Sequence, residues 1–295
     1  MARHGPVPFL GQAPTNIKLH QILKNPQQII SALPATRLYE ELPQIPKFSA
    51  LPGAILAANE GDDGRLALIL DSTIFHPQGG GQPADTGFIT AATDDSNFKF
   101  IVQDVRSKDG IVYHYGVVEE EDSGRDFLEK GREVLLHVDE CRRKLNSRLH
   151  SAGHLLDGCL LNVGLGHLEP AKAYHFPDGP FVEYKGTVPQ NELQNKQKEL
   201  EVEANELIST GGIVSAAVLP YEEASALCGG YLPDYIPKGS TPRIVKLGNF
   251  PGCPCGGTHV SDISEIIIFM FAYASGTMKM AYNCGAQHKN TTCSE

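Results

Sequence analysis

Two short motifs in the sequence each place a pair of metal-binding side chains four residues apart. His150 and His154 form the first pair, and Cys255 and His259, roughly a hundred residues later, form the second. On a helix, side chains at i and i+4 project from one face, which suits two ligands of one tetrahedral ion. Three imidazoles and a thiolate suit Zn²⁺ and are poor ligands for Mg²⁺ or Ca²⁺. The sequence therefore predicts one zinc ion and a fold that brings these distant segments together.

Two questions about this site stay open at the level of sequence. Cys253 lies two residues before Cys255 and could replace it as the thiolate ligand, although Cys255 has the i, i+4 spacing to His259. Four protein ligands normally fill the coordination sphere of a structural zinc, whereas catalytic zinc keeps a position for water or substrate. The metal is therefore either a purely structural ion or part of a reaction centre.

The composition is that of a globular protein with room for two domains. The chain has 295 residues, of which 41% are hydrophobic and 20% are charged. It has no apolar run long enough to span a membrane, and its first residues lack the order of a secretory signal, so we expect a cytoplasmic protein that does not enter a membrane. The net charge of −10 is unusual for a nucleic-acid-binding protein, so such a role would need a local basic patch. Nothing in the sequence indicates the oligomeric state.

The spacing of apolar residues changes near residue 139. Before it, short apolar runs separated by turn residues predict a small antiparallel β-barrel, with strands near 66–70, 98–102, 110–114 and 134–138. After it we expect an α+β fold, with helices at 142–161 and 190–209 and strands at 213–219, 243–247 and 265–273. We divide the chain into an N-terminal extension (1–35), a glycine-rich β-barrel domain (36–138), an α+β zinc-binding domain (139–283) and a C-terminal tail (284–295).

Three consecutive glycines, Gly79, Gly80 and Gly81, follow a predicted strand. Glycines allow backbone N–H groups to approach a ligand closely and can form an anion-binding nest. The segment lacks the Lys-Ser/Thr pair of a P-loop and the pattern of a dinucleotide-binding turn. Its role is therefore either to bind a ligand or to make a bulged turn between strands.

Together these motifs resemble a known family. The segments HSAGH (150–154), CGGTHV (255–260) and TIFHPQGGGQPADTG (73–87) are similar to the editing module of alanyl-tRNA synthetases in its free-standing AlaX-type form. The resemblance extends over roughly residues 36–282 and includes YHFPDGPFVEY (174–184) and RIVK (243–246). Threonyl-tRNA synthetases share the module, but the glycine-rich segment favours the alanyl branch.

The resemblance implies an aminoacyl-tRNA deacylase that contributes to translation fidelity. It implies hydrolysis, without ATP, of tRNA(Ala) mischarged with serine or glycine, and zinc bound by the four ligands named above. A pocket made for alanine cannot strongly exclude glycine and rejects serine poorly, so a second hydrolytic site is needed. The zinc would activate a water, polarise the carbonyl, or only hold the pocket in place.

Further site residues follow from the motifs. Candidates beside the zinc are Gln82, Thr258 and Ser151; His175, Asp178 and Glu183 either bind substrate or belong to an ordinary polar turn and strand. The expected tRNA contacts are the three glycines and the basic side chains of Arg142, Arg143, Lys172 and Lys279. The basic run at 142–148 is equally typical of a solvated helix face.

The chain also departs from the family pattern. Synthetase editing domains often carry threonine just before the second histidine, where this chain has Gly153, and their closing Arg-Val-Ser-Tyr strand corresponds here to Lys279–Tyr282. Residues 283–295 match nothing expected of the family. Two alternatives therefore remain: a non-catalytic, zinc-stabilised tRNA- or protein-binding relative, and a different ester or amide hydrolase. The absence of glutamate within HxxxH argues against a zinc protease.

Overall fold

The computed structural model describes residues 36–37, 51–60, 65–93, 97–119, 128–267, 271–274 and 278–282. The proposed N-terminal extension (1–35) and C-terminal tail (284–295) lie outside these residues. The first part of the described chain is a closed antiparallel barrel with strand order β2-β3-β7-β6-β5-β8. Its strands are β2 (Leu51–Glu60), β3 (Leu66–Leu70), β5 (Gly87–Ala91), β6 (Lys99–Lys108), β7 (Ile111–Val118) and β8 (Glu133–Val138). Two short strands, β1 (Thr36–Arg37) and β4 (Ser72–Thr73), pair in parallel.

The barrel forms because its strands alternate between inward and outward residues. On β7, Val112 and His114 are buried while Tyr113 and Tyr115 are partly exposed, which is the period-two pattern of a strand with one face in the core. The largest fully buried side chains of the barrel include Phe75, Phe100, Leu68, Ile89 and Leu136. The predicted antiparallel barrel is therefore confirmed.

The second part of the chain is built around helix α4 (Glu140–Asn162). Asp139 caps its N-terminus by accepting the N–H of Arg142 at 2.9 Å. The buried face of the helix includes Leu149, Leu155, Leu156 and Leu160. Helix α5 (Leu193–Thr210) packs on the same core through Leu200 and Ala204. Both helices begin and end within three residues of their predicted bounds.

Two further sheets complete this part. One has the order β14-β15-β10-β9, and the other has the order β11-β12-β13. Their strands are β9 (Glu169–Tyr174), β10 (Phe181–Lys185), β11 (Val214–Val218), β12 (Arg243–Leu247), β13 (Cys253–Pro254), β14 (Phe271–Ala274) and β15 (Met278–Tyr282), and the short helix α6 (Tyr221–Leu227) follows β11. The expected strand at 265–273 differs. Asp262 and Glu265 form a capping box around a 3₁₀ turn (η3, Ile263–Glu265), and the described strand begins at Phe271.

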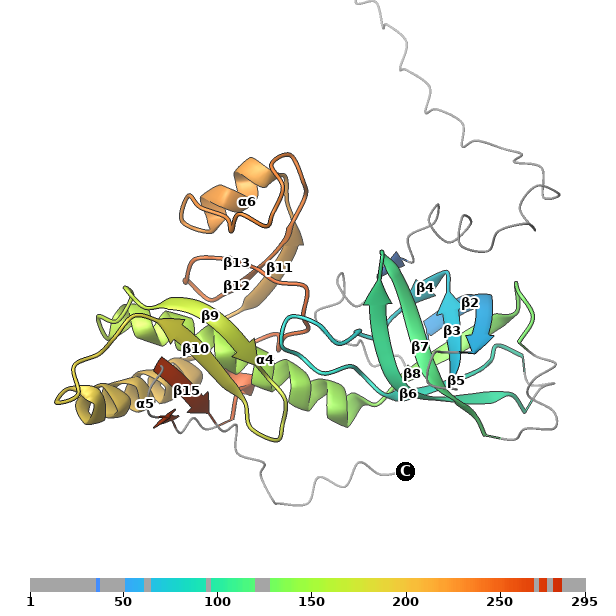
Figure 1. Cartoon of the computed structure of the whole chain (residues 1–295), viewed down its shortest axis with the longest axis horizontal. Coiled ribbons are helices and arrows are strands. Elements are labelled where there is room, and N and C mark those ends of the chain that lie inside the picture. Colours follow the sequence, from blue (N-terminus) through green and yellow to red (C-terminus); the bar gives the residue numbers. More distant parts are fainter. Residues whose placement is uncertain are drawn as a thin grey trace, which may run out of the picture.

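The barrel and the α4 part each have a hydrophobic cluster of their own. Polar contacts join them: the N–H of Asp139 donates to Thr86 O (2.8 Å), and Arg142 Nε donates to Ala84 O (3.0 Å). In Figure 1 the loop between β4 and β5 extends from the barrel toward α4. This loop carries the glycine-rich turn. Among the described helices, none is long and apolar enough to cross a lipid bilayer.

Candidate metal centre

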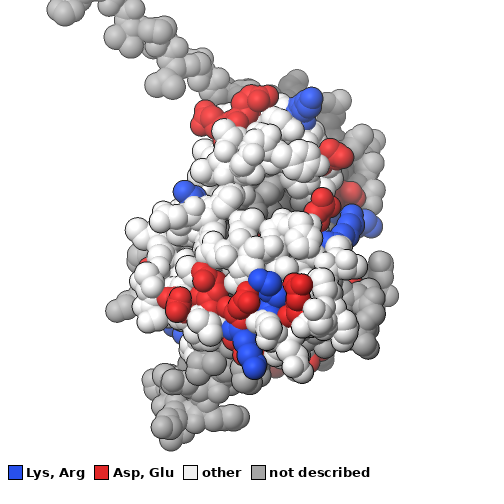
Figure 2. Space-filling model, turned by 90° about the vertical axis from the view of Figure 1, so that its left-hand side faces the viewer, with Lys and Arg blue, Asp and Glu red and all other residues white. Residues whose placement is uncertain are grey.

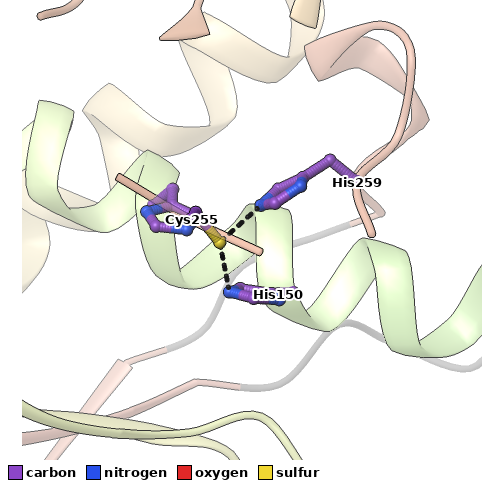
Figure 3. Close-up of side chains that lie close together, drawn as sticks. His150, Cys255 and His259 are labelled. Atoms are coloured by element: carbon purple, nitrogen blue, oxygen red, sulfur yellow. Dashed lines mark hydrogen bonds between the residues drawn. The ribbon is translucent and has the colours of Figure 1, made fainter. Parts of the chain in front are cut away.

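The two predicted ligand pairs meet in the structure. His150 and His154 lie on α4, and Cys255 and His259 lie in the segment after β13. One donor atom from each of these four residues lies within 4.8 Å of the others. Cys255 Sγ is 3.4 Å from His150 Nε2 and 3.7 Å from His259 Nε2. Dashed lines mark these two contacts in Figure 3. The rings of His150 and His154 stack with their centroids 5.0 Å apart. We call these four residues the metal cluster.

The protonation states of the metal cluster suit a divalent metal. Burial lowers the pKa of His154 to about 4 and the pKa values of His150 and His259 well below the ordinary value, so all three rings are neutral at pH 7. Burial raises the pKa of the Cys255 thiol to about 11, so metal binding would displace its proton. His154 Nε2 is buried and has no hydrogen-bond partner among the described residues. This donor set and the unpartnered nitrogen fit zinc.

Cys253, the competing thiol, lies outside the metal cluster. Its Sγ is 3.3 Å from His154 Nδ1, the nitrogen on the other side of the ring from Nε2, and 3.7 Å from Val245 O. The group of donor atoms that lie within 4.8 Å of one another includes Cys255 and not Cys253. Of the two candidate ligands, the geometry favours Cys255.

Gln82, from the glycine-rich turn, orients His150. Its Oε1 accepts the N–H of Thr258 (3.0 Å) and lies 2.8 Å from His150 Nδ1, and its Nε2 donates to Thr258 Oγ1 (2.8 Å). Because the Thr258 N–H can only donate, the amide oxygen must face it, and His150 Nδ1 must therefore carry the hydrogen. This tautomer leaves His150 Nε2 as a bare lone pair on the side of Cys255. A hydrogen bond of this kind fixes the ring of a metal-binding histidine and raises its basicity.

Gly80 and Gly81 make the turn that presents Gln82. Gly79 and Gln82 exchange backbone hydrogen bonds of 3.1 and 2.9 Å, and both intervening glycines have positive φ (56° and 79°). These are the signs of a type I′ turn, which favours glycine. A side chain at Gly81 would also lie 2.6 Å from a backbone oxygen of β9. The His175 N–H donates to Gly81 O (2.8 Å), so the turn docks beside the metal cluster.

The segment 255–259, which carries the second ligand pair, contacts both α4 and β12. A side chain at Gly257 would overlap the ring of His150, so glycine is required for this close approach. Arg243, at the start of β12, donates from Nη1 to Cys255 O (2.7 Å) and Gly257 O (3.0 Å). The family-like segment RIVK (243–246) includes Arg243, but no role could be assigned to it from sequence, because its partners are backbone oxygens that a sequence pattern does not reveal.

Two serines of α4 anchor the same segment. Ser147 Oγ lies 2.8 Å from Thr258 Oγ1, and Ser151 Oγ accepts the N–H of Val260 at 3.1 Å. The Thr258 hydroxyl accepts from Gln82 Nε2 and shares a second hydrogen bond with the Ser147 hydroxyl. Thr258 thus positions Gln82, and Ser151, expected beside the metal, holds the loop instead.

His175 lies directly against the metal cluster. Its ring stacks on that of His150 with centroids 4.4 Å apart. Tyr282 Oη donates to Leu149 O (3.1 Å) and also contacts His175 Nδ1, so His175 donates the hydrogen of that second bond. Burial lowers the pKa of His175 to about 3, which makes it a poor general base at pH 7. A side chain at Gly153 would overlap the His175 ring and lie 3.1 Å from Tyr282 Oη. Glycine here makes room for His175.

Arg143 has a different role from the expected tRNA contact. It is 5% exposed, its guanidinium pairs with the fully buried Asp85, and it also donates to Ile74 O. Both partners belong to the chain before β5. A buried, paired guanidinium is not offered to a phosphate, so we assign Arg143 to the joint between barrel and α4 and no longer to tRNA binding.

The other predicted cationic contacts reach the surface. Arg142 is half-buried and its Nε donates to a barrel carbonyl at 3.0 Å. Lys172 on β9 and Lys279 on β15 both pair in register with Glu183 of β10, and both ammonium groups lie over the ring of Phe181. On the face drawn in Figure 2, acidic and basic side chains are interspersed. The described part of that face therefore presents no continuous basic patch.

Asp157 and an adjoining pocket were not anticipated. Asp157 accepts the hydroxyl of Tyr184 (2.7 Å) and lies 4.0 Å from His154 Nδ1, and burial raises its pKa to about 7. Its position three residues after His154, on the same helix face, is the sequence signal that could have pointed to it. A pocket of about 170 Å³ lies beside His154, Asp157 and Cys253, with Phe250 among its apolar walls.

Comparison with known proteins identifies related sequences. Residues 22–142 match a family model described as class II (A) tRNA synthetases. The chain is 27% identical over 226 residues to the alanyl-tRNA editing protein AlaX-L of Pyrococcus horikoshii, an alignment that covers 75% of this chain and 52% of that protein.

Alanine–tRNA ligases match the same chain at slightly higher identity. The ligase of Neisseria meningitidis serogroup C is 31% identical over 219 residues, covering 74% of this chain and 24% of the ligase. The ligase of Acidithiobacillus ferridurans is 32% identical over 218 residues, covering 73% and 23%. The chain thus spans about half the length of AlaX-L and about a quarter of the ligases. These matches show that about three quarters of this chain is similar both to an alanyl-tRNA editing protein and to one region of alanine–tRNA ligases.

Proposed function

We propose that this protein hydrolyses tRNA(Ala) that carries the wrong amino acid, chiefly serine and also glycine, at a site centred on one zinc ion. The observation that carries the proposal is the link from the glycine-rich turn to the metal cluster through Gln82. A zinc ion whose only task is to hold α4 against the segment after β13 needs no contact with the barrel. Here the barrel supplies the residue that sets the tautomer of a ligand.

The accessibility of the metal cluster supports a reaction at this site. His150 and His259 are each 2% exposed, whereas the side chain of His154 is 17% exposed and Cys255 is half-buried. Solvent therefore reaches parts of the His154 ring and of Cys255, although His154 Nε2 itself is buried, and the pocket of about 170 Å³ lies against His154 and Cys253. A purely structural zinc site is normally closed.

The reaction is ester hydrolysis. Water adds to the carbonyl carbon of the aminoacyl ester, the bond from that carbon to the terminal ribose oxygen breaks, and the proton from water goes to the ribose oxygen. A zinc ion held by the metal cluster would supply a Lewis acid for the carbonyl or for water. Gln82 keeps the Nε2 lone pair of His150 available for the metal. The uncharged ring of His175 stacks on the ring of His150. The ester is already activated, so no ATP is required.

The proposal includes the setting in which the protein works. Its partner is mischarged tRNA(Ala), contacted by the glycine-rich turn, Arg142, Lys172 and Lys279, and its compartment is the cytoplasm. The proposed boundary between barrel domain and editing domain, near residue 138, is supported by the two separate hydrophobic clusters.

A second function is favoured by one observation. Four protein donors lie within 4.8 Å of one another, which is the number that fills a structural zinc site. A non-catalytic relative would keep zinc for folding and bind tRNA or protein without hydrolysis.

The test measures release of serine from Ser-tRNA(Ala) by the full chain, by Cys255→Ala and by Cys228→Ala. Cys228 is a half-buried free thiol beside α6, so it serves as the matched control. Zinc content and thermal unfolding are measured on the same samples. We expect hydrolysis by the wild type and by Cys228→Ala, and a loss of about 100-fold or more in Cys255→Ala, because a metal ligand is removed.

A folded, zinc-loaded wild type that leaves Ser-tRNA(Ala) intact would contradict the proposal and favour the non-catalytic relative. Where Cys255→Ala fails to fold, Gln82→Ala takes its place, because Gln82 touches a ligand without being one.

A further inference from the structure

The sheet that contains β9, β10 and β15 has two chemically different faces. On the inner face, Val182, Tyr184, Met280 and Tyr282 are each at most 5% exposed and belong to the hydrophobic cluster around α4. Strand register places a separate set of side chains on the outer face. Phe181 is paired with Tyr174 and Ala281, and Glu183 with Lys172 and Lys279. Side chains alternate between the faces of a strand, so aromatic and cationic residues gather on the outer face.

The aromatic residues of this face form a stacked column. The rings of Phe176 and Tyr174 have centroids 4.4 Å apart and an interplanar angle of 7°. Tyr174 in turn stacks on Phe181 at 5.4 Å and 23°. The ammonium group of Lys279 lies 3.5 Å from the centroid of the Phe181 ring, and that of Lys172 lies 5.8 Å away. We call Phe176, Tyr174 and Phe181 the aromatic column.

The Phe176 end of the column is open. The rings are only partly buried, and within the part of the chain that the structure describes, Phe176 stacks on Tyr174 and on no other ring or cation. Two acidic groups lie nearby: Asp178 accepts the hydroxyl of Tyr174 (3.0 Å), and Glu183 lies between the two lysines. A column of partly exposed aromatic rings with lysines over the Phe181 end is a combination that can bind unpaired nucleotides, because every base has a face that stacks and every nucleotide carries a phosphate.

We propose that the aromatic column binds the unpaired nucleotides near the 3′ end of tRNA, with one base stacked on Phe176 and a phosphate near Lys172 or Lys279. This proposal rests on the proposed function, because it places the RNA that leads to the reacting ester. It adds base stacking, a contact that is independent of base identity, to the two lysines expected from the sequence.

The position of the column relative to the metal cluster supports this occupant. His175, between Tyr174 and Phe176 in the chain, points the other way and stacks on His150 of the metal cluster at 4.4 Å. Strand β9 is at the edge of its sheet, as Figure 1 shows. Single-stranded RNA can therefore pass around this edge from one face of the sheet to the other.

The test is equilibrium binding of the full, zinc-loaded chain to deacylated tRNA(Ala) and to the same tRNA without its unpaired 3′ nucleotides. We expect Phe176→Ala to weaken binding of the intact tRNA by about 5-fold or more, and Phe176→Tyr to restore it. The matched control is Phe88→Ala, which removes a half-buried ring of the barrel that stacks on His137 at 4.4 Å and lies 5.3 Å from Lys99 Nζ. We expect this control to leave binding unchanged.

Two charge variants give an independent readout. Lys279→Ala should weaken binding and reduce the slope of log K against log salt by about 1. Glu183→Gln should tighten binding, because it removes the negative charge between the two lysines.

The proposal is overturned if folded Phe176→Ala binds intact tRNA as tightly as the wild type, or if the truncated tRNA binds as tightly as the intact one. Because the tRNA in this test carries no aminoacyl ester, the assay measures tRNA binding independently of ester hydrolysis. A chain that shows this binding but no release of serine disproves the proposed hydrolysis alone. A chain that hydrolyses Ser-tRNA(Ala), but whose tRNA affinity is unchanged by Phe176→Ala, disproves only the proposed role of the aromatic column.

Discussion

Gln82 connects the glycine-rich turn to the metal cluster through three hydrogen bonds. We expect Gln82→Ala to weaken zinc binding by about 10–100-fold, because His150 loses the partner that fixes its tautomer. The variant also leaves the buried Thr258 N–H without its acceptor, at a cost to stability of about 1–3 kcal/mol. Competition with a chromophoric chelator measures the first effect, and denaturant unfolding measures the second.

Gln78→Ala provides the matched control for Gln82→Ala. Gln78 belongs to the same turn but is exposed. Its backbone N–H donates a hydrogen bond to Val105 O. The zinc affinity of this variant should equal that of the wild type. Equal zinc affinities for Gln82→Ala and Gln78→Ala would disprove the orienting role of Gln82.

Gly153 is required by its neighbours and not by its own backbone conformation. A methyl group there would overlap the ring of His175 and approach Tyr282 Oη to 3.1 Å. We expect Gly153→Ala to destabilise the protein by about 1–3 kcal/mol, as overpacked cores do. A side chain at Gly179 would meet nothing within 4 Å, so Gly179→Ala should change stability by less than about 0.5 kcal/mol. Urea unfolding of both variants tests this; equal stabilities would show that His175 can move aside.

Some site residues follow from local spacing and others do not. The grouping of His150, His154, Cys255 and His259 could be predicted because i, i+4 pairs and a Cys/His donor set have a physical meaning independent of the fold. Arg143 could not be assigned, because its partner Asp85 is distant in the chain and a basic run at a helix start is equally typical of an RNA contact. The role of His175 could not be decided from the sequence either, because its contacts are distant in the chain. Its role depends on contacts with His150 and Tyr282 from other elements.

At the level of elements, long periodic segments were the most predictable. The helix with the first ligand pair was expected at 142–161 and spans Glu140–Asn162; the strand at 66–70 was placed as it is observed. The strand expected at 265–273 was wrong at its start, because the Asp262 side chain accepts the N–H of Ser264 and turns the chain into a 3₁₀ helix. Apolar runs predict burial, but local side-chain bonds to the backbone decide where a strand begins.

The barrel contains a buried histidine that links its stability to pH. His114 donates from Nδ1 to Leu68 O (3.0 Å), because a carbonyl oxygen can only accept. In the neutral ring Nε2 therefore accepts the Thr73 hydroxyl (2.7 Å). Burial lowers its pKa from 6.5 to about 4. The unfolded chain therefore binds a proton at higher pH than the folded chain does. The stability contribution is present above about pH 6.5 and is lost as pH falls toward 4.

The loss amounts to about 3 kcal/mol for a shift of this size. Other buried histidines act in the same direction, so the comparison is with His114→Gln, whose amide can keep both hydrogen bonds without titrating. Denaturant unfolding near neutral pH and near pH 4 should show a smaller acid-induced loss in the variant, by about that amount. The same pH dependence in both proteins would contradict this role of His114.

At the scale of the whole molecule, the buried pair of Arg143 and Asp85 joins the barrel to α4. Asp85 is fully buried and also accepts the N–H of His76 at 2.7 Å. We expect Asp85→Ala to destabilise the protein by about 3–5 kcal/mol, because it leaves a buried guanidinium without its counter-charge. Asp104, which pairs with Arg106 at the surface (2.8 Å), is the control, and Asp104→Ala should cost less than about 1 kcal/mol. Equal effects in thermal unfolding would show that the joint is not held by this pair.

The joint explains why the two parts of the chain act on one site. Each part has its own hydrophobic cluster, and the contacts between them run through polar groups of the segment between β4 and β5. That segment supplies both Asp85, which holds α4, and Gln82, which holds His150. A mutation that loosens the joint should therefore weaken zinc binding as well as stability.

The most direct test of the central claim is titration of the metal-free full chain with zinc while release of serine from Ser-tRNA(Ala) is measured. One donor atom from each of the four residues lies within 4.8 Å of the others, so we predict that the hydrolysis rate rises with added zinc and reaches a plateau at one equivalent per chain. The absence of hydrolysis from a folded chain that has bound one equivalent of zinc would contradict the claim that this metal cluster is the centre of an aminoacyl-tRNA deacylase.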